Sequence, residues 1–279
     1  MAKRNKQDKN QAKAPRQARP VHSVEQYISL HEQYHRELRK ERYGRTHEDY
    51  GFPLLIRDGV CAAEPDMGHA AGIVIDALPK NLKGKDVLDV GCGAGVIGIA
   101  AAYRGANVIA CDNSPKAIQL TQENLENNSD IQDRVTVVLS NIFDGVRGEL
   151  PHQKYDFILA NLWFPIARKG FEDTARQAEE CYKRYFSEVR GLLKPNGVAC
   201  LTSGAAANSN ATMAAMSTAG ITAEKAVVQK NHFGNQVAMN WYLYSFNADG
   251  QPATLRPKVH QGHPARLSGL PAYRPGQTL

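Results

Sequence analysis

The chain has 279 residues, of which 42% are hydrophobic and 22% are charged, and its formal net charge is +6. These values are ordinary for a globular protein, and they exclude a collagen, a coiled coil and a wholly disordered chain. The longest nearly apolar run, around residues 95–102, is far shorter than the ~20 residues of a membrane-spanning helix, so we expect no membrane association.

Both ends of the chain are basic. Residues 1–20 contain seven Lys or Arg and one Asp, residues 251–279 contain four Lys or Arg and no acid, and the residues between are slightly acidic. Neither end has a hydrophobic periodicity, so both are predicted to be disordered. One interpretation is a tether to a polyanion, RNA first, and the alternative is a solubilising tail without a partner. The basic start has no apolar core behind it, so no secretory signal is expected.

Helices and strands alternate along the body of the chain. An amphipathic helix is predicted over residues 23–42, within an N-terminal lid or extension at residues 21–58, and a second helix is expected over residues 66–78. The strands that follow are predicted at residues 86–90, 107–111, 135–140, 155–160, 197–203, 221–228 and 238–246, and the helices among them at residues 96–103, 115–127, 171–190 and 208–219.

This repetition of strand and helix predicts an α/β fold. It indicates a single doubly wound, mostly parallel seven-stranded sheet with helices on both faces, in a domain spanning residues 59–250. Only the short segment 231–235 separates the last two strands, which leaves no room for a crossover helix. We therefore expect the last strand to run antiparallel to its neighbours.

A glycine-rich loop follows the first strand of this sheet, at the edge where open α/β sheets bind ligands. It reads DVGCGAG from Asp89, and residues 93–98 also match the dinucleotide fingerprint G-x-G-x-x-G, which alone is a weak signal. Asp89 argues against a dinucleotide, because its carboxylate opposes a pyrophosphate at this loop. The same carboxylate suits a ligand with an ammonium group. The reversed last strand is a second feature that a dinucleotide-binding fold does not need.

The segment VLDVGCGAGVIGIAAA resembles the class I, Rossmann-like S-adenosylmethionine-dependent methyltransferases. The resemblance implies S-adenosyl-L-methionine as the cofactor. It also implies that Asp89 and the loop backbone engage the methionine part, that Asp112 accepts hydrogen bonds from the ribose hydroxyls, and that Asn113 follows the ribose toward the adenine. The cofactor-binding residues implied in this way are Asp89, Gly91, Cys92, Gly93, Gly95, Asp112, Asn113, Asn141 and Ile142.

The adenine end of the cofactor is assigned to the residues after the third strand. Ser140 and Asn141 match the pair that contacts the adenine edge in the resembled family, which more often has Asp where this chain has Asn141. An Asn side chain also accepts a hydrogen bond from the adenine amino group. Simpler interpretations stay open for two residues: Asp112 as an acid at a helix start, and Asn141 as a turn residue.

The chemistry is predicted at the end of the fourth strand, which reads Asn161-Leu162-Trp163-Phe164. The resembled amino-methyltransferases, which act on RNA bases and release-factor glutamine, carry Asn or Asp, then Pro-Pro and an aromatic residue. Here Leu162-Trp163 replaces Pro-Pro. As catalytic residues, Asn161 (through Oδ1) and Leu162 (through its carbonyl) are expected to accept the two N–H bonds of a planar amino group, and Phe164 or Trp163 to stack on it. If Asn161 only ends a strand, an oxygen or carbon methyltransferase is the alternative.

The segment before the loop, residues 59–78, resembles the corresponding segment of the same amino-methyltransferases, where a turn and a helix close over the methionine end of the cofactor. His69 is thereby a substrate-pocket candidate, with a helix cap as the simpler interpretation. Trp163 is a second candidate. His232 and Phe233, in the turn between the last two strands, are further candidates, although such hairpins often face solvent.

No metal site is predicted. The nine histidines are scattered, and none pairs with Cys or Asp at the spacing of metal ligands. The five cysteines include no C-x-x-C pair, which argues against a disulfide framework and a zinc ribbon. We therefore expect a protein of a reducing compartment, the cytoplasm.

Together these features predict an S-adenosylmethionine-dependent N-methyltransferase. The favoured acceptor is a base in RNA, because of the basic tails and the resemblance, with a protein amide close behind. A small-metabolite methyltransferase, acting on N or O under a lid formed by residues 21–50, is the alternative within enzymes. A methyltransferase-like module that binds RNA or a partner without turnover is the alternative outside enzymes. The replacement of Pro-Pro favours this module, and the intact glycine-rich loop opposes it.

Overall fold

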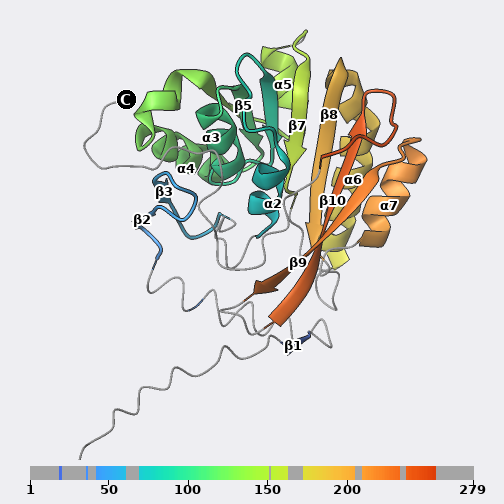
Figure 1. Cartoon of the computed structure of the whole chain (residues 1–279), viewed down its shortest axis with the longest axis horizontal. Coiled ribbons are helices and arrows are strands. Elements are labelled where there is room, and N and C mark those ends of the chain that lie inside the picture. Colours follow the sequence, from blue (N-terminus) through green and yellow to red (C-terminus); the bar gives the residue numbers. More distant parts are fainter. Residues whose placement is uncertain are drawn as a thin grey trace, which may run out of the picture.

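Figure 1 shows the computed structural model of the chain, which describes residues 19–20, 36, 42–60, 69–150, 152–162, 172–204, 209–232 and 237–255. One sheet runs through the middle, and helices lie on both sides of it. The predicted doubly wound α/β fold is confirmed.

The central strands of the main sheet, β4 to β8, are parallel. The bounds of the strands are β1 Arg19–Pro20, β2 Thr46–His47, β3 Leu54–Leu55, β4 Asp86–Val90, β5 Asn107–Asp112, β6 Val135–Leu139, β7 Tyr155–Ala160, β8 Leu193–Gly204, β9 Glu224–His232 and β10 Val237–Asn247. The main sheet has the order β6-β5-β4-β7-β8-β10, with β9 and the two-residue β1 also paired to β10. β10 is antiparallel to both β8 and β9, while β4 to β8 pair in parallel. The predicted seven strands and the reversed last strand are thus confirmed.

Among the described residues, three α-helices cover each face of the sheet (Figure 1). One layer contains α2 (His69–Ala77), α3 (Val96–Tyr103) and α4 (Pro115–Glu126), and the other contains α5 (Asp144–Glu149), α6 (Glu172–Glu188) and α7 (Ser209–Thr218). Side chains alternate across β4, so Val87 packs into the core under α3 whereas Leu88 and Val90 pack into the core under α6.

Several expected boundaries need correction. His232 is the last residue of β9, where it pairs with Val237, rather than part of the turn between the last two strands. Backbone pairing with β10 extends β9 over residues 229–232, which are polar and show no hydrophobic alternation in the sequence. The chain stays packed beyond residue 250, since Pro252 forms a bridge with Phe246 and Leu255 is buried. The pattern also missed α5, because six residues are too few to show a helical period.

The N-terminal extension is described in part. The helix predicted over residues 23–42 lies outside the described residues, apart from its residues 36 and 42. Further along, β2 and β3 form an antiparallel pair, so the described end of the extension is a small hairpin. Its Phe52 and Leu54 side chains are buried against the domain.

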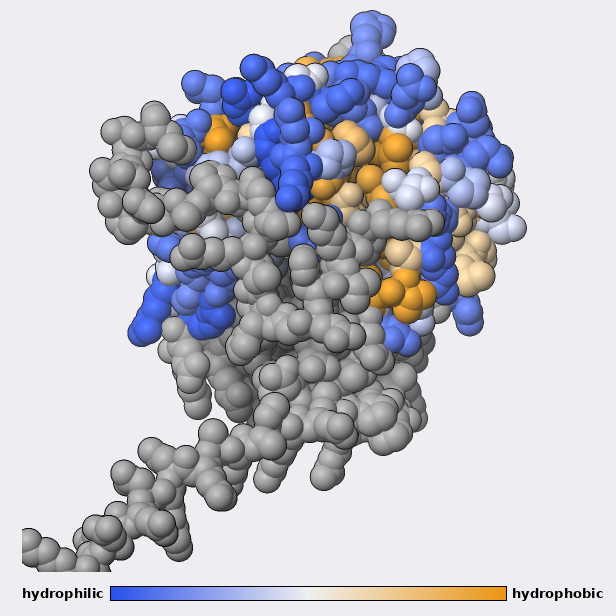
Figure 2. Space-filling model, viewed as in Figure 1, coloured by the Kyte–Doolittle hydropathy of each residue, from blue (hydrophilic) through white to orange (hydrophobic). Residues whose placement is uncertain are grey.

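Hydrophilic residues cover most of the coloured surface in the view of Figure 2, with hydrophobic residues gathered in smaller areas between them. Over the described part of the chain, the large apolar side chains that are strongly exposed are Leu139, Met213 and Val227, which lie on separate elements. No described helix has both the length and the apolar character needed to cross a bilayer.

Candidate functional site

A cavity of about 520 Å³ lies beyond the carboxyl ends of the parallel strands. Its walls come from the loop after β4, the ends of β5, β6 and β7, the helix α6 and the residues before α2. The lining residues are Gly59, Val60, Val90, Gly91, Gly93, Asp112, Asn113, Ser114, Ala117, Ser140, Asn141, Ile142, Asn161, Leu162, Gln177, Glu180, Cys181 and Arg184. The location is the one that a doubly wound sheet predicts, and the volume is typical of small-ligand sites.

The glycine-rich loop needs its glycines at two positions in particular. Gly91 has a φ of 72°, and a Cβ there would lie 2.8 Å from the Leu162 Cδ2 atom. Gly95 has a φ of 83°, and a Cβ there would lie 2.8 Å from the Thr121 Cγ2 atom. Side chains are disfavoured at both positions by conformation and by space. The loop is therefore held close against its neighbours, with its backbone facing the cavity at Gly91 and Gly93.

Thr121 of α4 supports this loop from behind. Its hydroxyl donates to the Gly93 carbonyl at 2.9 Å and lies 3.5 Å from the Cys92 sulfur. Burial raises the pKa of the Cys92 thiol well above its usual value, so this thiol stays neutral. Cys92 and Gly95, which the resemblance implies as cofactor residues, are not among the lining residues of the cavity. Their direct contact with a cofactor stays a prediction.

Asp89 lies directly behind the loop. Its side chain is 0% exposed, its Oδ2 atom accepts a hydrogen bond from the Gly98 N–H at 2.9 Å, and its Oδ1 atom has no hydrogen-bond partner among the described residues. Burial raises the pKa of this carboxyl from 3.8 to about 7, the Gly98 bond lowers it in part, and the Asp112 charge raises it further. The carboxylate does not line the cavity, so its contact with an ammonium group stays a prediction. A positive charge placed nearby would stabilise its ionised form.

The raised pKa of Asp89 predicts how the cofactor-free protein responds to pH. The folded protein holds this proton more tightly than the unfolded chain, so the free energy of unfolding from this group falls as pH rises from about 4 to about 7 and is constant above. We expect Asp89→Asn to match the wild type below pH 4 and to exceed it by up to ~2–4 kcal/mol at pH 7 and above. Urea unfolding at a series of pH values measures this difference. A difference independent of pH would contradict the assignment.

Asp112 ends β5 on the wall of the cavity. Its Oδ2 atom accepts from the Gly93 N–H at 3.0 Å, and its Oδ1 atom accepts from the Ser114 N–H at 2.9 Å. Each carboxylate oxygen keeps a lone pair for a further donor. Asn113 follows on the same wall and is exposed. The arrangement leaves Asp112 able to accept hydroxyl groups from a ligand, as the resemblance implies.

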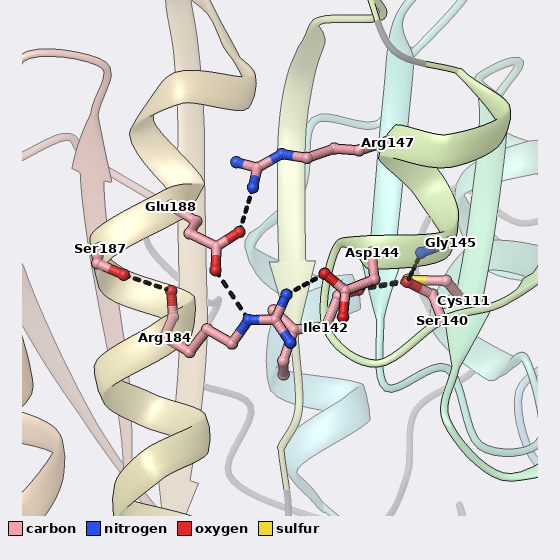
Figure 3. Close-up of polar contacts among 9 residues, drawn as sticks. All are labelled: Cys111, Ser140, Ile142, Asp144, Gly145, Arg147, Arg184, Ser187 and Glu188. Carbon is pink, nitrogen blue, oxygen red and sulfur yellow. Dashed lines mark hydrogen bonds and ion pairs between the residues drawn. The ribbon is translucent and has the colours of Figure 1, made fainter.

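The loop after β6 contributes Asn141 and Ile142 to the cavity wall, and Figure 3 shows how Ile142 is held. Ile142 has a φ of 55°, which is strained for a β-branched residue. Its carbonyl is held in this conformation by the Ser140 hydroxyl at 2.9 Å and by the Cys111 thiol at 3.7 Å, and Ser140 Oγ accepts in turn from the Gly145 N–H at 3.0 Å. The strained residue is thus fixed next to Asn141, which the resemblance assigns to the adenine edge.

Four charged side chains tie α6 to α5 beside this loop (Figure 3). Arg184 of α6 pairs with Asp144 and with Glu188, and Glu188 also pairs with Arg147 of α5. The hydrogen bond from the Arg184 guanidinium lowers the pKa of Asp144, and the carboxylates of Asp144 and Glu188 raise the pKa of Arg184. Arg184 lines the cavity, but its charge is already balanced by two carboxylates.

Asn161 and Leu162 directly follow β7 and line the cavity. The Asn161 Oδ1 atom accepts from the Thr202 hydroxyl of β8 at 3.0 Å. The Leu162 carbonyl accepts from the Tyr182 hydroxyl of α6 at 3.2 Å. Two hydrogen-bond acceptors on adjacent residues therefore lie on one wall, and each is oriented by a hydroxyl donor behind it.

The structure gives no side-chain positions for the remaining predicted residues. Trp163, Phe164 and Phe233 lie outside the described residues, and the side chains of His69 and His232 are not described. No group of three or more His, Cys, Asp or Glu side chains with the placement of metal ligands occurs within the described ranges.

The sequence did not indicate that α6 forms part of the cavity wall. Gln177, Glu180, Cys181 and Arg184 share one face of that helix and line the cavity. Their 3.6-residue spacing marks them as one face, but no signal in the sequence says which end of the sheet that face meets. Thr202 was missed for a similar reason, since it belongs to a strand that is distant in sequence from Asn161.

Known proteins are similar to this chain mainly over the domain that contains the sheet. A family profile described as "Methyltransferase domain" matches residues 81–248, which is more than half of the chain. The ribosomal protein L11 methyltransferase of Thermosipho melanesiensis is 35% identical over 128 residues, covering 45% of this chain and 40% of that protein. The ribosomal RNA large subunit methyltransferase G of Photobacterium profundum is 26% identical over 152 residues, covering 53% of this chain and 37% of that protein. The chain spans about two-fifths of the length of these relatives.

Solved structures share the fold. Precorrin-6y C5,15-methyltransferase from Geobacter metallireducens GS-15 aligns with a TM-score of 0.50 at 14% identity, covering 70% of this chain and 94% of that one. The protein SMU.776, complexed with SAH, aligns with a TM-score of 0.51 at 15% identity, covering 69% of this chain and 53% of that one. At this identity the likeness concerns the fold alone.

Proposed function

The chain belongs to the methyltransferase-domain family and has the fold of such enzymes, and from this premise we propose that it is an S-adenosylmethionine-dependent enzyme that methylates a planar amino or amide nitrogen. The observation that carries the proposal is the pair of acceptor atoms on one wall of the cavity, Asn161 Oδ1 and the Leu162 carbonyl oxygen. The same cavity is bounded by the glycine-rich loop.

The residues around the loop fit S-adenosylmethionine. The buried Asp89 carboxyl has one oxygen without a hydrogen-bond partner among the described residues, and it complements an ammonium group. Asp112 retains acceptor capacity for the ribose hydroxyls. Asn141, to which we assign the adenine edge, lines the same cavity, as does Ile142. When bound, S-adenosylmethionine supplies an electrophilic methyl group. The chain's own contribution is to hold this group and an acceptor nitrogen in line.

Asn161 and Leu162 provide what an amino nitrogen on a planar group needs. Such a nitrogen shares its lone pair with the planar group, which makes it a weak nucleophile. Two acceptors for its two N–H bonds favour a pyramidal nitrogen with a directed lone pair. The oxygen atoms of Asn161 and Leu162 each accept one bond from a hydroxyl and keep a second lone pair for the acceptor nitrogen. The nitrogen loses a proton to water after methylation, so no strong base is required.

For the acceptor we favour a base in RNA. The basic residues of the two tails offer counter-charges for phosphates. At the cavity itself the charge of Arg184 is balanced by Asp144 and Glu188, so phosphate contacts are expected from the tails rather than from α6. Similar proteins are named for ribosomal RNA and for ribosomal protein L11, which supports RNA and protein as the two acceptor classes. A protein amide is our second hypothesis.

Methyl-labelled S-adenosylmethionine tests the proposal directly. The full chain is incubated with separated RNA, protein and small-molecule fractions from cells in which its gene has been deleted. We expect label in RNA that is recovered as an N-methylated base after digestion. Label only in the protein fraction would move the acceptor to a protein amide. Label only in small molecules would overturn the macromolecular acceptor, and no label in any fraction would favour a module without turnover.

Thr202 is expected to affect the rate of methyl transfer by orienting the Asn161 side chain. Its side chain is 1% exposed and its hydroxyl holds the Asn161 amide. With the labelled fraction as acceptor, Thr202→Val should lower kcat by about tenfold while KM and the affinity for S-adenosylhomocysteine (SAH) stay within about twofold. Thr202→Ser, which retains the hydroxyl, should restore most of kcat. Equal losses in both variants would show that packing, rather than the hydrogen bond, matters at this position.

A further inference from the structure

Residues 52–60 form a segment, here named the strap, that contacts both α3 and α4. Phe52 is 1% exposed and stacks on Tyr103 of α3 with ring centroids 5.5 Å apart. Near the other end, Arg57 pairs with Glu123 of α4 at 2.6 Å. The strap is therefore docked at both ends on the helices that flank the glycine-rich loop.

The strap ends in the cavity wall. Gly59 and Val60 both line the cavity, although they precede the glycine-rich loop by some thirty residues in the sequence. A Cβ at Gly93 would lie 3.9 Å from the Val60 Cγ1 atom, so Val60 faces the loop across a narrow space. The strap and the loop are thus adjoining walls of one site.

Asn124 of α4 is bonded to both walls at once. Its side chain is 0% exposed. The Oδ1 atom accepts from the Leu55 N–H at 2.5 Å, and the Nδ2 group donates to the Leu55 carbonyl at 3.1 Å and to the Ala94 carbonyl at 2.9 Å. Leu55 belongs to the strap and Ala94 to the loop. The Asn124 amide therefore pairs with the backbone of Leu55 as a neighbouring strand would. Its NH2 group also donates to the Ala94 carbonyl and so holds the loop in place.

We propose that Asn124 is a positioning residue that couples docking of the strap to the ligand-binding shape of the glycine-rich loop. Undocking the strap removes two of the three hydrogen bonds that orient the buried Asn124 amide and releases Val60 from the cavity wall. The Ala94 carbonyl then loses a fixed donor. By reciprocity, a ligand that stabilises the loop stabilises the docked strap to the same extent.

Hydrogen–deuterium exchange of the full chain with and without SAH tests the coupling, and it rests on the proposed cofactor site. We expect SAH to slow exchange in the loop and also in peptides covering the strap. If SAH does not bind the wild type at all, the proposed cofactor site fails. If SAH binds and protects the loop while exchange in the strap is unchanged, the coupling fails and the cofactor site stands.

Two variants separate coupling from general loss of stability. Phe52→Leu loosens the strap at a residue that is not part of the cavity wall, and calorimetric titration should show SAH binding weakened by about five- to tenfold. The matched control is Phe246→Leu, an equally buried ring in the core of the opposite face, which should change the affinity less than about twofold. Asn124→Ala should weaken SAH binding by about tenfold or more and remove the protection of the strap. If Asn124→Ala does not fold, the two Phe variants decide, and wild-type affinity in Phe52→Leu overturns the proposal.

Discussion

Asn161→Ala is expected to lower the rate of methyl transfer by about 100- to 1000-fold while leaving SAH affinity within about twofold of the wild type. The side-chain oxygen of Asn161 is an oriented acceptor on the cavity wall, and alanine has no atom to replace it. Because the glycine-rich loop and the end of β5 are untouched, cofactor binding should persist. Single-turnover kinetics with the labelled acceptor fraction and calorimetric titration with SAH measure the two quantities.

A matched control for this variant is Asn107→Ala. Asn107 is exposed at the opposite end of β5 and is not part of the cavity wall. Its substitution should leave both the rate and the affinity unchanged. If Asn161→Ala turned over at the wild-type rate, Asn161 would have no part in the mechanism, and an oxygen or carbon acceptor would become the better hypothesis.

Asp89→Asn is expected to change ligand affinity and stability in opposite directions. The variant keeps the size of the side chain and an oxygen for the Gly98 N–H, but it removes a buried charge. A buried ammonium group left without its carboxylate costs about 3–5 kcal/mol, so SAH affinity should fall by about 100-fold or more at pH 8. The cofactor-free variant should nevertheless unfold at higher urea concentration than the wild type at this pH, because burial raises the pKa of Asp89 to about 7.

Titration and urea unfolding at pH 8 on the same preparations distinguish the outcomes for Asp89. Lower SAH affinity together with a higher free energy of unfolding would support the proposal that the Asp89 carboxylate binds the ligand although its buried charge destabilises the fold. Unchanged affinity would remove Asp89 from the cofactor site. Loss of both SAH affinity and stability would indicate that the substitution disturbs the local structure, because the hydrogen bond from the Gly98 N–H to the side chain at position 89 would be broken.

The fold could be predicted because its signals are local. β4 is a short strand whose Val87, Leu88 and Val90 side chains are buried. α4 begins where Ser114 and Pro115 mark a helix start, with the Ser114 hydroxyl accepting from the Ala117 N–H at 3.4 Å. The carboxyl ends of parallel strands meet at one edge, so the prediction that Gly91, Asp112 and Asn161 share a site needed only strand order.

The missing parts depend on contacts between distant segments. Thr202 meets Asn161 because β7 and β8 pair in parallel with Ala160 opposite Leu201, and no local pattern states that register. Asn124 looks like an ordinary polar residue on an amphipathic helix, yet it is fully buried because its amide satisfies the backbone of Leu55. Hydrogen-bonding capacity, rather than hydropathy, decides which face such a residue takes.

We propose that the cavity beside the glycine-rich loop binds S-adenosylmethionine and not a dinucleotide. Separate calorimetric titrations of SAH, NAD⁺ and FAD into the full chain test it most directly. We expect saturable one-to-one binding of SAH and no saturable binding of either dinucleotide. Saturable binding of NAD⁺ or FAD, together with no binding of SAH, would contradict it.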